Sequence, residues 1–256
     1  MKRTFFFSLF FLSGLFAKEK KVFLLHKYTK GASYRYSIKN DINNVNVVSG
    51  NRMTSKTHTE MVIKEEIKDV KNDTVKIVFI IEDAKGNVEV EGGSFPIKEM
   101  EMMKGKKIKV LLYKNQVIKT EGIEGSNFLS SLSSSYQFLP RDSIACIGER
   151  WKKNFSENGR EEKYIYTLRG IETLKGKKCA VISFEAEVKE KGERKRMRMK
   201  ANVDIKGKGS GIIYFAIDEG VIVKEETHMK LEGVVDFREQ KIYSTTEMES
   251  ILEMMK

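Results

Sequence analysis

Hydrophobic and polar residues alternate with a period of two over long parts of the chain. From Val221 to Phe237 most apolar residues share one parity, which also includes Glu225, and most charged residues hold the other. Successive side chains of a strand point to opposite faces, whereas a helix would mix both sets on every face. Similar patterns predict strands at 75–81, 108–112, 178–188, 194–205, 211–217 and 241–252.

Short polar segments, most of them carrying Gly or Asn, separate these runs. They lie at 71–73, 85–87, 114–115, 175–177 and 218–220. Short connections of this composition favour hairpins between neighbouring strands. The sequence therefore predicts an all-β protein, built either as one antiparallel curved sheet or as an open barrel.

The stretch between Pro96 and Pro140 differs from the rest. Ser126 is a suitable helix cap, apolar residues follow it at helical spacing, and Pro140 would end the element. We expect one short helix near 126–136, although the serine-rich run there also permits a loop. This segment, 126–140, would join two sub-halves at 18–125 and 141–256 of a single domain at 18–256.

Two similar halves are a further possibility that the pattern leaves open. Tyr34-x-Tyr36 follows Gly31, and Tyr164-x-Tyr166 follows Gly159; each leads into a long predicted strand. Tyr-x-Tyr is common on strands and the downstream spacings differ. A single curved sheet without a repeat fits the same residues.

Residues 1–17 have the composition of a secretory signal peptide. Lys2 and Arg3 precede an apolar run at 4–16, and Ala17 is a small residue before a charged segment. The run is shorter than the ~20 residues that a membrane-spanning helix needs. We expect an exported protein, periplasmic or extracellular, with no stable transmembrane anchor after cleavage.

Cysteine and histidine are scarce. Cys146 and Cys179 are the only cysteines, and their spacing fits either a disulfide in an exported protein or two buried thiols. The three histidines form no spaced metal-binding pair, and we expect all of them to be solvated or capping residues. No metal and no cofactor is expected.

Motifs of catalysis are not found in the sequence. It contains no Gly-x-Ser-x-Gly elbow, no phosphate-binding glycine loop and no Cys–His pairing of recognisable spacing. Adjacent acids such as Glu65 and Glu66 would point to opposite faces of a strand and cannot act as a pair. We therefore predict a non-enzymatic protein.

Positive charge is the first candidate functional feature. The chain carries a formal net charge of +11, and one predicted strand face gathers basic residues that suit an anionic ligand. Intermixed acids and export argue against nucleic acid. A solvated outer face that discourages edge-to-edge aggregation explains the same row. The candidate anion-binding residues are Arg194, Arg196, Arg198 and Lys200.

The apolar strand face is the second candidate. Flexible methionines and aromatics on a curved sheet can accept an acyl chain, although an ordinary core has the same composition. The candidate ligand-binding residues are Met61, Ile63, Phe79, Phe184, Met197, Met199, Phe215, Met229 and Leu231.

The order of strands and turns resembles exported bacterial β-rich proteins of uncharacterised function. The likeness rests on Gly105 to Val110, the turn at Lys114-Asn115, Leu139-Pro140 and the Gly148-x-x-Trp151 element. More loosely, the architecture is similar to the open β-barrels of envelope lipid-carrier and lipoprotein-localisation proteins. This chain departs from their lipidated members because it has no acylated cysteine. The resemblance implies no catalytic residue.

Together these features predict a non-catalytic envelope protein that binds a lipid or another amphipathic molecule in a curved sheet. The alternative is an interaction module that presents basic strand faces to an anionic envelope polymer or to a protein. A cavity between strands would favour the first, and a filled core with one continuous basic patch would favour the second.

Overall fold

The protein is described here from a computed structural model that places residues 21–122, 136–157, 159–196, 199–237 and 240–256. Strands dominate these residues. The elements are β1 (Lys21–Phe23), β2 (Ser33–Val48), β3 (Asn51–Lys71), β4 (Thr74–Val90), β5 (Gly93–Pro96), α1 (Lys98–Glu101), β6 (Lys107–Tyr113), β7 (Gln116–Glu121), β8 (Ile144–Cys146), β9 (Arg150–Glu157), β10 (Arg160–Leu174), β11 (Lys177–Arg196), β12 (Met199–Ala216), β13 (Val221–Phe237) and β14 (Gln240–Met254).

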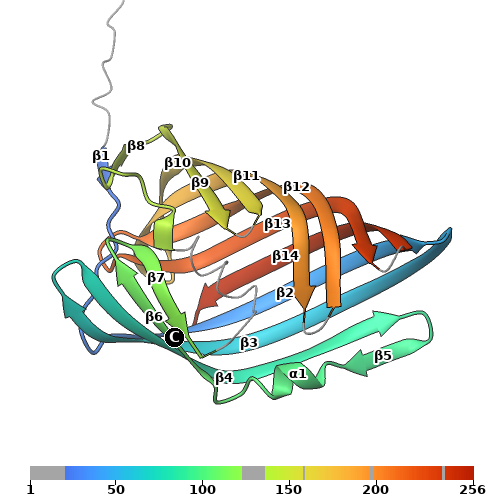
Figure 1. The fold of residues 1–256 in the computed structure, drawn as a ribbon. Helices are drawn as coiled ribbons and strands as arrows, with labels where there is room; N and C mark the ends of the chain where they lie inside the picture. Colours follow the sequence, from blue (N-terminus) through green and yellow to red (C-terminus); the bar gives the residue numbers. More distant parts are fainter. Residues whose placement is uncertain (1–20, 123–135, 158, 197–198, 238–239) are drawn as a thin grey trace, which may run out of the picture.

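A single antiparallel sheet of 12 strands forms the body of the molecule (Figure 1). Its order is β7-β6-β4-β3-β2-β14-β13-β12-β11-β10-β9, with β5 paired to the far end of β4, so nearly all neighbours are joined by hairpins. The pairing of β14 with β2 joins the early strands to the late ones in one continuous sheet. The edges β7 and β9 do not pair, and the sheet stays open rather than closing into a barrel. The predicted all-β antiparallel curved sheet is confirmed.

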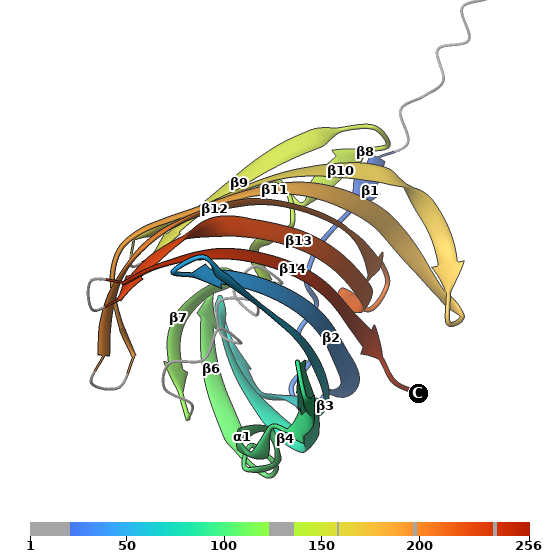
Figure 2. The ribbon, with the colours of Figure 1, turned by 90° about the vertical axis from the view of Figure 1, so that its right-hand side faces the viewer.

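The sheet curves into an arch, as Figure 2 shows from the side. The longest strand, β3, has 21 residues and extends for about 70 Å. Bulges interrupt the ladders at Val62/Ile63, Ile67/Asp69, Leu168/Gly170 and Tyr214/Phe215. A bulge bends its strand and increases the local twist, so these positions help the sheet to curve.

Two segments outside the sheet cover one end of its inner face. Residues 22–28 and 136–139 contribute Leu24 and Phe138, both fully buried, to a cluster with Tyr166 and Phe215. The Trp151 indole N–H donates to the carbonyl oxygen of Phe138 at 2.6 Å, and the Leu24 N–H donates to the carbonyl oxygen of Ser143 at 2.8 Å. We call this region the covered end.

The covering segments also connect distant strands. His26 contacts Phe215 of β12 and Tyr136, and Tyr136 in turn contacts Phe79 of β4 and Glu65 of β3. Strands β13, β14 and β2 separate β12 from β3 in the sheet. Only His26 and Tyr136 lie between Phe215 of β12 and the residues of β3 and β4, because this route crosses the concave side of the arch and does not follow the sheet.

The other end of the inner face has no such cover among the described residues. Its inward side chains on β2, β3, β13 and β14 are mostly half-buried, in contrast to the buried residues of the same parity at the covered end. We call this region the uncovered end. The outer face along the whole sheet is largely exposed and charged.

Several sequence predictions need correction. The run 194–205 is not one strand: β11 ends at Arg196 and β12 begins at Met199, with Arg194 paired to Ala201. The expected turn at 85–87 lies inside β4, where Gly86 pairs with Thr59. At 85–87 pairing with the neighbouring strand overrides the local turn signal, whereas at 194–205 the alternating pattern gave no sign that the chain divides into two antiparallel strands.

Other predictions fall on residues that the structure does not describe. The signal peptide at 1–17 and most of the expected helix at 126–136 lie outside the described ranges, although Tyr136 and Gln137 are helical where the description resumes. The helix whose bounds the structure gives is α1, which the sequence did not predict.

Candidate functional site

The inner face of the arch gathers the groups with the strongest claim to function. Most of the predicted apolar residues point to it, but they divide between its two ends. Met61, Ile63 and Phe79 belong to one buried cluster at the covered end, and Phe184 and Phe215 belong to the other. They pack as core. Whether any of them contacts a ligand stays a prediction.

Met229 and Leu231 lie farther along β13. Met229 is buried and Leu231 is half-buried, both on the inward parity. Met199 is the first residue of β12, with its side chain outside the description, and Met197 lies outside the described residues.

At the uncovered end, one side of the inner face is mainly apolar and the other side is mainly polar. Strands β11 to β13 supply mainly apolar and glycine residues to it, whereas β2, β3 and β14 supply many hydroxyl and amide side chains. On the polar side the Thr246 hydroxyl donates to Asn44 Oδ1 at 2.7 Å, and Asn40 Nδ2 donates to Thr59 Oγ1 at 3.1 Å. The apolar side carries Val188, Val203, Ile205, Met229, Leu231 and Val235.

Glycines line the middle of the apolar side. Gly207, Gly209 and Gly211 occupy successive inward positions of β12. A Cβ atom at Gly207 would lie 2.4 Å from Leu231 Cδ2, and one at Gly211 would lie 2.5 Å from Phe184 Cζ. Glycine is required here because the large side chains of β11 and β13 fill the space over the β12 backbone.

A cluster of polar side chains lies inside the covered end. Glu65 of β3 is only 7% exposed and accepts a hydrogen bond from the Tyr136 hydroxyl at 2.9 Å. Burial raises the pKa of Glu65 to about 7, although hydrogen bonds from Tyr136 and Tyr36 oppose this effect. The sequence placed Glu65 and Glu66 on opposite faces of their strand, but gave no sign of these tyrosine partners.

His26 faces the same region from the covering segment. It is 8% exposed, and its Nδ1 lies 3.2 Å from the carbonyl oxygen of Gly220. Burial lowers the pKa of His26 to about 4, so the ring is neutral at physiological pH. Gly220 has φ +71° and lies so close to 25–27 that a Cβ atom would sit 2.3 Å from Lys27 N. The expectation that His26 is solvated or a cap is therefore wrong.

A small cavity joins these groups. It has a volume of ≈ 50 Å³ and is lined by His26, Tyr28, Tyr36, Glu65, Tyr136 and Leu252, among others. By the measure that places one water in about 10–15 Å³, the cavity holds a group of a few atoms and not an acyl chain. Its residues come from parts of the chain far apart in sequence, which is why no local motif announced it.

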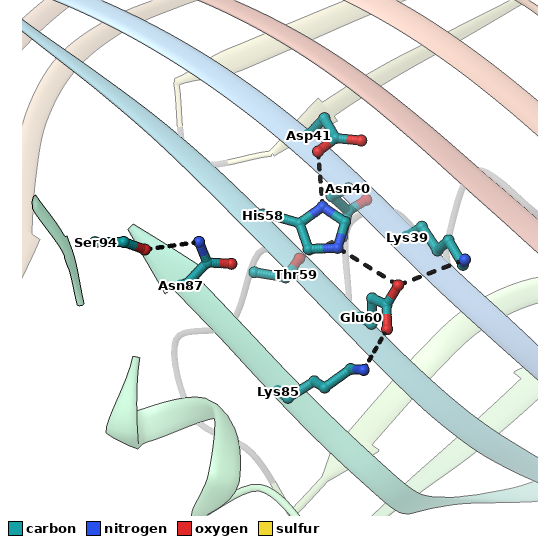
Figure 3. Close-up of polar contacts among 9 residues, drawn as sticks. All are labelled: Lys39, Asn40, Asp41, His58, Thr59, Glu60, Lys85, Asn87 and Ser94. Carbon is teal, nitrogen blue, oxygen red and sulfur yellow. Dashed lines mark hydrogen bonds and ion pairs between the residues drawn. The ribbon is translucent and has the colours of Figure 1, made fainter. Parts of the chain in front are cut away.

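The outer face of β3 carries a different polar network, shown in Figure 3. His58 Nδ1 lies 2.7 Å from Asp41 Oδ1, and its Nε2 lies 3.4 Å from Glu60 Oε1. Lys85 Nζ lies 2.7 Å from Glu60 Oε2, and this contact lowers the pKa of Glu60 to about 2. The hydrogen bond to Asp41 raises the pKa of His58. The network links β2, β3 and β4 at the surface.

Several basic residues of the outer face are paired with acids. Lys230 Nζ lies 3.3 Å from Glu232 Oε1 and 3.6 Å from Glu247 Oε1, and Lys191 Nζ lies 3.6 Å from Asp204 Oδ2. The candidate anion-binding row is divided between two antiparallel strands: Arg194 and Arg196 are in β11 and Lys200 is in β12. Arg198 lies outside the described residues, and the side chains of the other three are not described.

Cys146 and Cys179 lie in different parts of the fold. Cys146 ends β8 and is half-buried, and Cys179 is fully buried in β11. The structure forms no disulfide between these two described residues. Burial raises the pKa of the Cys179 thiol, which keeps it protonated.

No group of three or more His, Cys, Asp or Glu residues within the described ranges is arranged to hold a metal ion. Nor does any helix in those ranges have the length and apolar character to cross a membrane.

Comparison with known proteins gives a likeness of fold. No protein-family model matches the chain, and no curated protein matches it. Among solved structures, a lipovitellin studied for its lipid–protein interactions aligns with 90% of this chain at 11% identity and a TM-score of 0.57. The alignment covers 26% of the lipovitellin chain, so this chain spans about a quarter of its length. At this identity the similarity concerns the fold alone.

Two bacterial structures show weaker similarity. The COG4313 outer membrane channel of Pseudomonas putida F1 is 8% identical with a TM-score of 0.29, covering 90% of this chain and 98% of that chain. A DUF1329 family protein of Desulfovibrio piger ATCC 29098 is 13% identical with a TM-score of 0.18, covering 84% of each chain. Scores this low carry no argument. The chain is thus an open β-rich sheet with a lipovitellin-like fold and no family assigned by sequence.

Proposed function

We propose that this protein is an exported, non-catalytic binding protein of the cell envelope that holds a lipid or another amphipathic molecule against the uncovered end of its inner face. The observation that carries this proposal is the division of that surface. Apolar residues of β11 to β13 face one side, and hydroxyl and amide groups of β2, β3 and β14 face the other.

Such a surface matches an amphipathic molecule, which also has an apolar part and a polar part. An acyl chain lying on Met229, Leu231 and Val235 would remove apolar area from water at about 25 cal/mol per Å². Methionine adapts to irregular apolar shapes, so Met229 can adjust to the chain that lies beside it. Polar parts of the ligand would meet Asn44, Thr246 and their neighbours.

The lipovitellin similarity supports this choice at the level of fold only, since its lipid interactions belong to that protein. The apolar segment at 1–17 supports export. The pairing of several surface lysines with acids reduces the charge that is available to the anionic-polymer alternative.

The proposal is tested with a neutral single-chain fluorescent amphiphile, laurdan, whose emission shifts to the blue when it enters an apolar site. Two variants place a glutamate at adjacent positions of β13: Leu231→Glu on the inner face and Lys230→Glu on the exposed outer face. We expect Leu231→Glu to weaken binding about tenfold or more, because the acyl chain of the bound probe would remove water from the new carboxylate. We expect Lys230→Glu to change the affinity little. Equal loss in both variants, or no binding by the unmodified protein, would contradict the proposal.

A further inference from the structure

The cavity at the covered end is chemically unlike the surface that leads to it. Its walls combine one carboxyl group with tyrosine rings, whereas the inward positions of β14 beyond it are neutral. Leu252 lines the cavity, and Ser250 and Met248 continue the same inward row of β14 toward the uncovered end. A molecule lying on the inner face would thus reach the cavity with one end.

Glu65 has no ion-pair partner among the described residues. It accepts a hydrogen bond of 2.9 Å from the neutral hydroxyl of Tyr136. Lys27 also lines the cavity, but its Nζ donates to the carbonyl oxygen of Asp218 at 2.8 Å. A buried carboxyl group without a cation is costly in its charged form, and a cation from a ligand would remove that cost.

Two further buried atoms of the cavity walls have no hydrogen-bond partner within the described part of the chain: His26 Nε2 and the Tyr28 hydroxyl oxygen. His26 Nδ1 lies at hydrogen-bond distance from the Gly220 carbonyl oxygen, which can only accept. In the tautomer that carries its proton on Nδ1, Nε2 is an acceptor. The Tyr28 oxygen also has lone pairs to offer.

We propose that this cavity binds the primary ammonium group of an amphipathic amine. A primary ammonium carries three N–H donors, and Glu65, His26 Nε2 and the Tyr28 oxygen supply three acceptors around one cavity. The rings of Tyr28, Tyr36 and Tyr136 add the electron-rich faces that attract cations. This inference rests on the proposed function and specifies the head group of its ligand.

Size and charge exclude the other common head groups. A volume of ≈ 50 Å³ admits an ammonium with its first carbon and is too small for a bulky sugar group. A carboxylate or phosphate would also face Glu65. Because the chain has a net charge of +11, non-specific attraction favours anions, so a preference for a cation would have to arise locally.

The test compares four amphiphiles with the same decyl chain: decylammonium, decyltrimethylammonium, decanoate and decyl maltoside. Isothermal titration at about pH 8, below the micellar concentrations, measures their affinities for the full chain; at this pH a primary amine is charged, like a lysine side chain with a pKa of about 10.4. We expect decylammonium to bind about tenfold or more tightly than each of the other three.

The matched variants are Glu65→Gln in the cavity and Glu66→Gln on the outer face, where Glu66 pairs with Lys64 and Lys68. Glu65→Gln should abolish the preference for decylammonium, and Glu66→Gln should keep it. Tyr28→Phe is a milder second variant that keeps the ring and should weaken decylammonium binding several-fold. Near-ultraviolet circular dichroism checks that each variant is folded.

The outcomes separate the two proposals. Equal affinity for all four amphiphiles, unchanged in Glu65→Gln, would overturn the ammonium site and leave the proposed function standing. Binding of decanoate or decyl maltoside in preference to decylammonium would have the same meaning. Failure of all four to bind would overturn both proposals.

Discussion

Glu60 and Glu65 lie on the same strand, β3, and their environments move their pKa values in opposite directions. Glu60 faces outward, where Lys85 lowers its pKa to about 2. Glu65 faces inward, where burial raises its pKa to about 7. The period-two geometry of a strand therefore places one carboxylate in a solvated ion-pair network and the other in a nearly dry, tyrosine-lined cavity. The outer face provides charge, and the inner face provides a site.

The largest expected difference between the two faces concerns packing. Ile63→Ala removes a side chain that is 1% exposed and should cost about 2 to 5 kcal/mol of unfolding free energy. Lys64→Ala, on the outer face, should change it by about 0.5 kcal/mol or less. Urea denaturation of both variants measures this. Similar losses in the two would mean that the inner face at this end is not a packed core.

The next difference is in pH dependence, measured with Glu65→Gln. The pKa of Glu65 is raised from 4.5 to about 7, so the folded state binds its proton more tightly than the unfolded state. Its contribution to stability is fully present below pH 4.5 and is lost as the pH rises through 7. The unmodified protein should therefore lose about 3 kcal/mol relative to Glu65→Gln between pH 4.5 and pH 8.

His26 has the opposite trend, because burial lowers its pKa from 6.5 to about 4. Its contribution is present above pH 6.5 and is lost as the pH falls through 4, so the two groups partly cancel in the unmodified protein. His26 is present in both proteins, and its effect cancels in the difference between them. A difference that stays constant from pH 4.5 to pH 8 would contradict the buried, raised-pKa state of Glu65.

Tyr136→Phe sharpens the comparison by removing one hydrogen bond to Glu65. At about pH 8, where the carboxyl is charged, the loss should be about 1.5 to 3 kcal/mol, and at about pH 5 about 0.5 to 1.5 kcal/mol. Thermal and urea denaturation at both pH values measure it. Tyr113→Phe, at a position that is 45% exposed, is the control. An equal cost at the two pH values would mean that this hydrogen bond does not depend on the charge of Glu65.

The smallest effect is expected on the outer face. Glu60→Gln weakens contacts with Lys85, Lys39 and His58, but solvent screens these pairs, so the cost should be under about 1 kcal/mol and should shrink in high salt. The raised pKa of His58 adds stability at low pH that is lost as the pH rises through its folded-state value. A loss of unfolding free energy that exceeds about 1 kcal/mol and does not shrink in high salt would mean that this network is needed to stabilise the fold.

The sequence predicted much of the fold because the decisive pattern is local. Alternation placed Met229 inward and His228, Lys230 and Glu232 outward, as the structure has them. The turn at Lys114-Asn115 was also expected, and both residues have positive φ angles, of 49° and 62°. Where the sequence failed, as in the hairpin between β11 and β12, the chain reverses without a glycine or proline signal.

The candidate site was beyond the sequence for a different reason. Glu65 could be placed on the inward parity, but its environment depends on His26, Tyr28 and Tyr136, which reach it only when the sheet curves and two loops cross its inner face. Such a cluster has no fixed spacing. In retrospect the sequence did hold a signal, since Glu65 lies between Ile63 and Ile67 on the strand face that is otherwise apolar there.

The central claim, that the inner face holds an amphipathic molecule, is tested most directly by native mass spectrometry of the protein purified from an exporting host, followed by organic extraction. The account predicts a stoichiometric mass excess that extracts as lipid from the unmodified protein and from Lys230→Glu, and that is lost from Leu231→Glu. A bare mass in the unmodified protein, unchanged after incubation with envelope lipids, would contradict it.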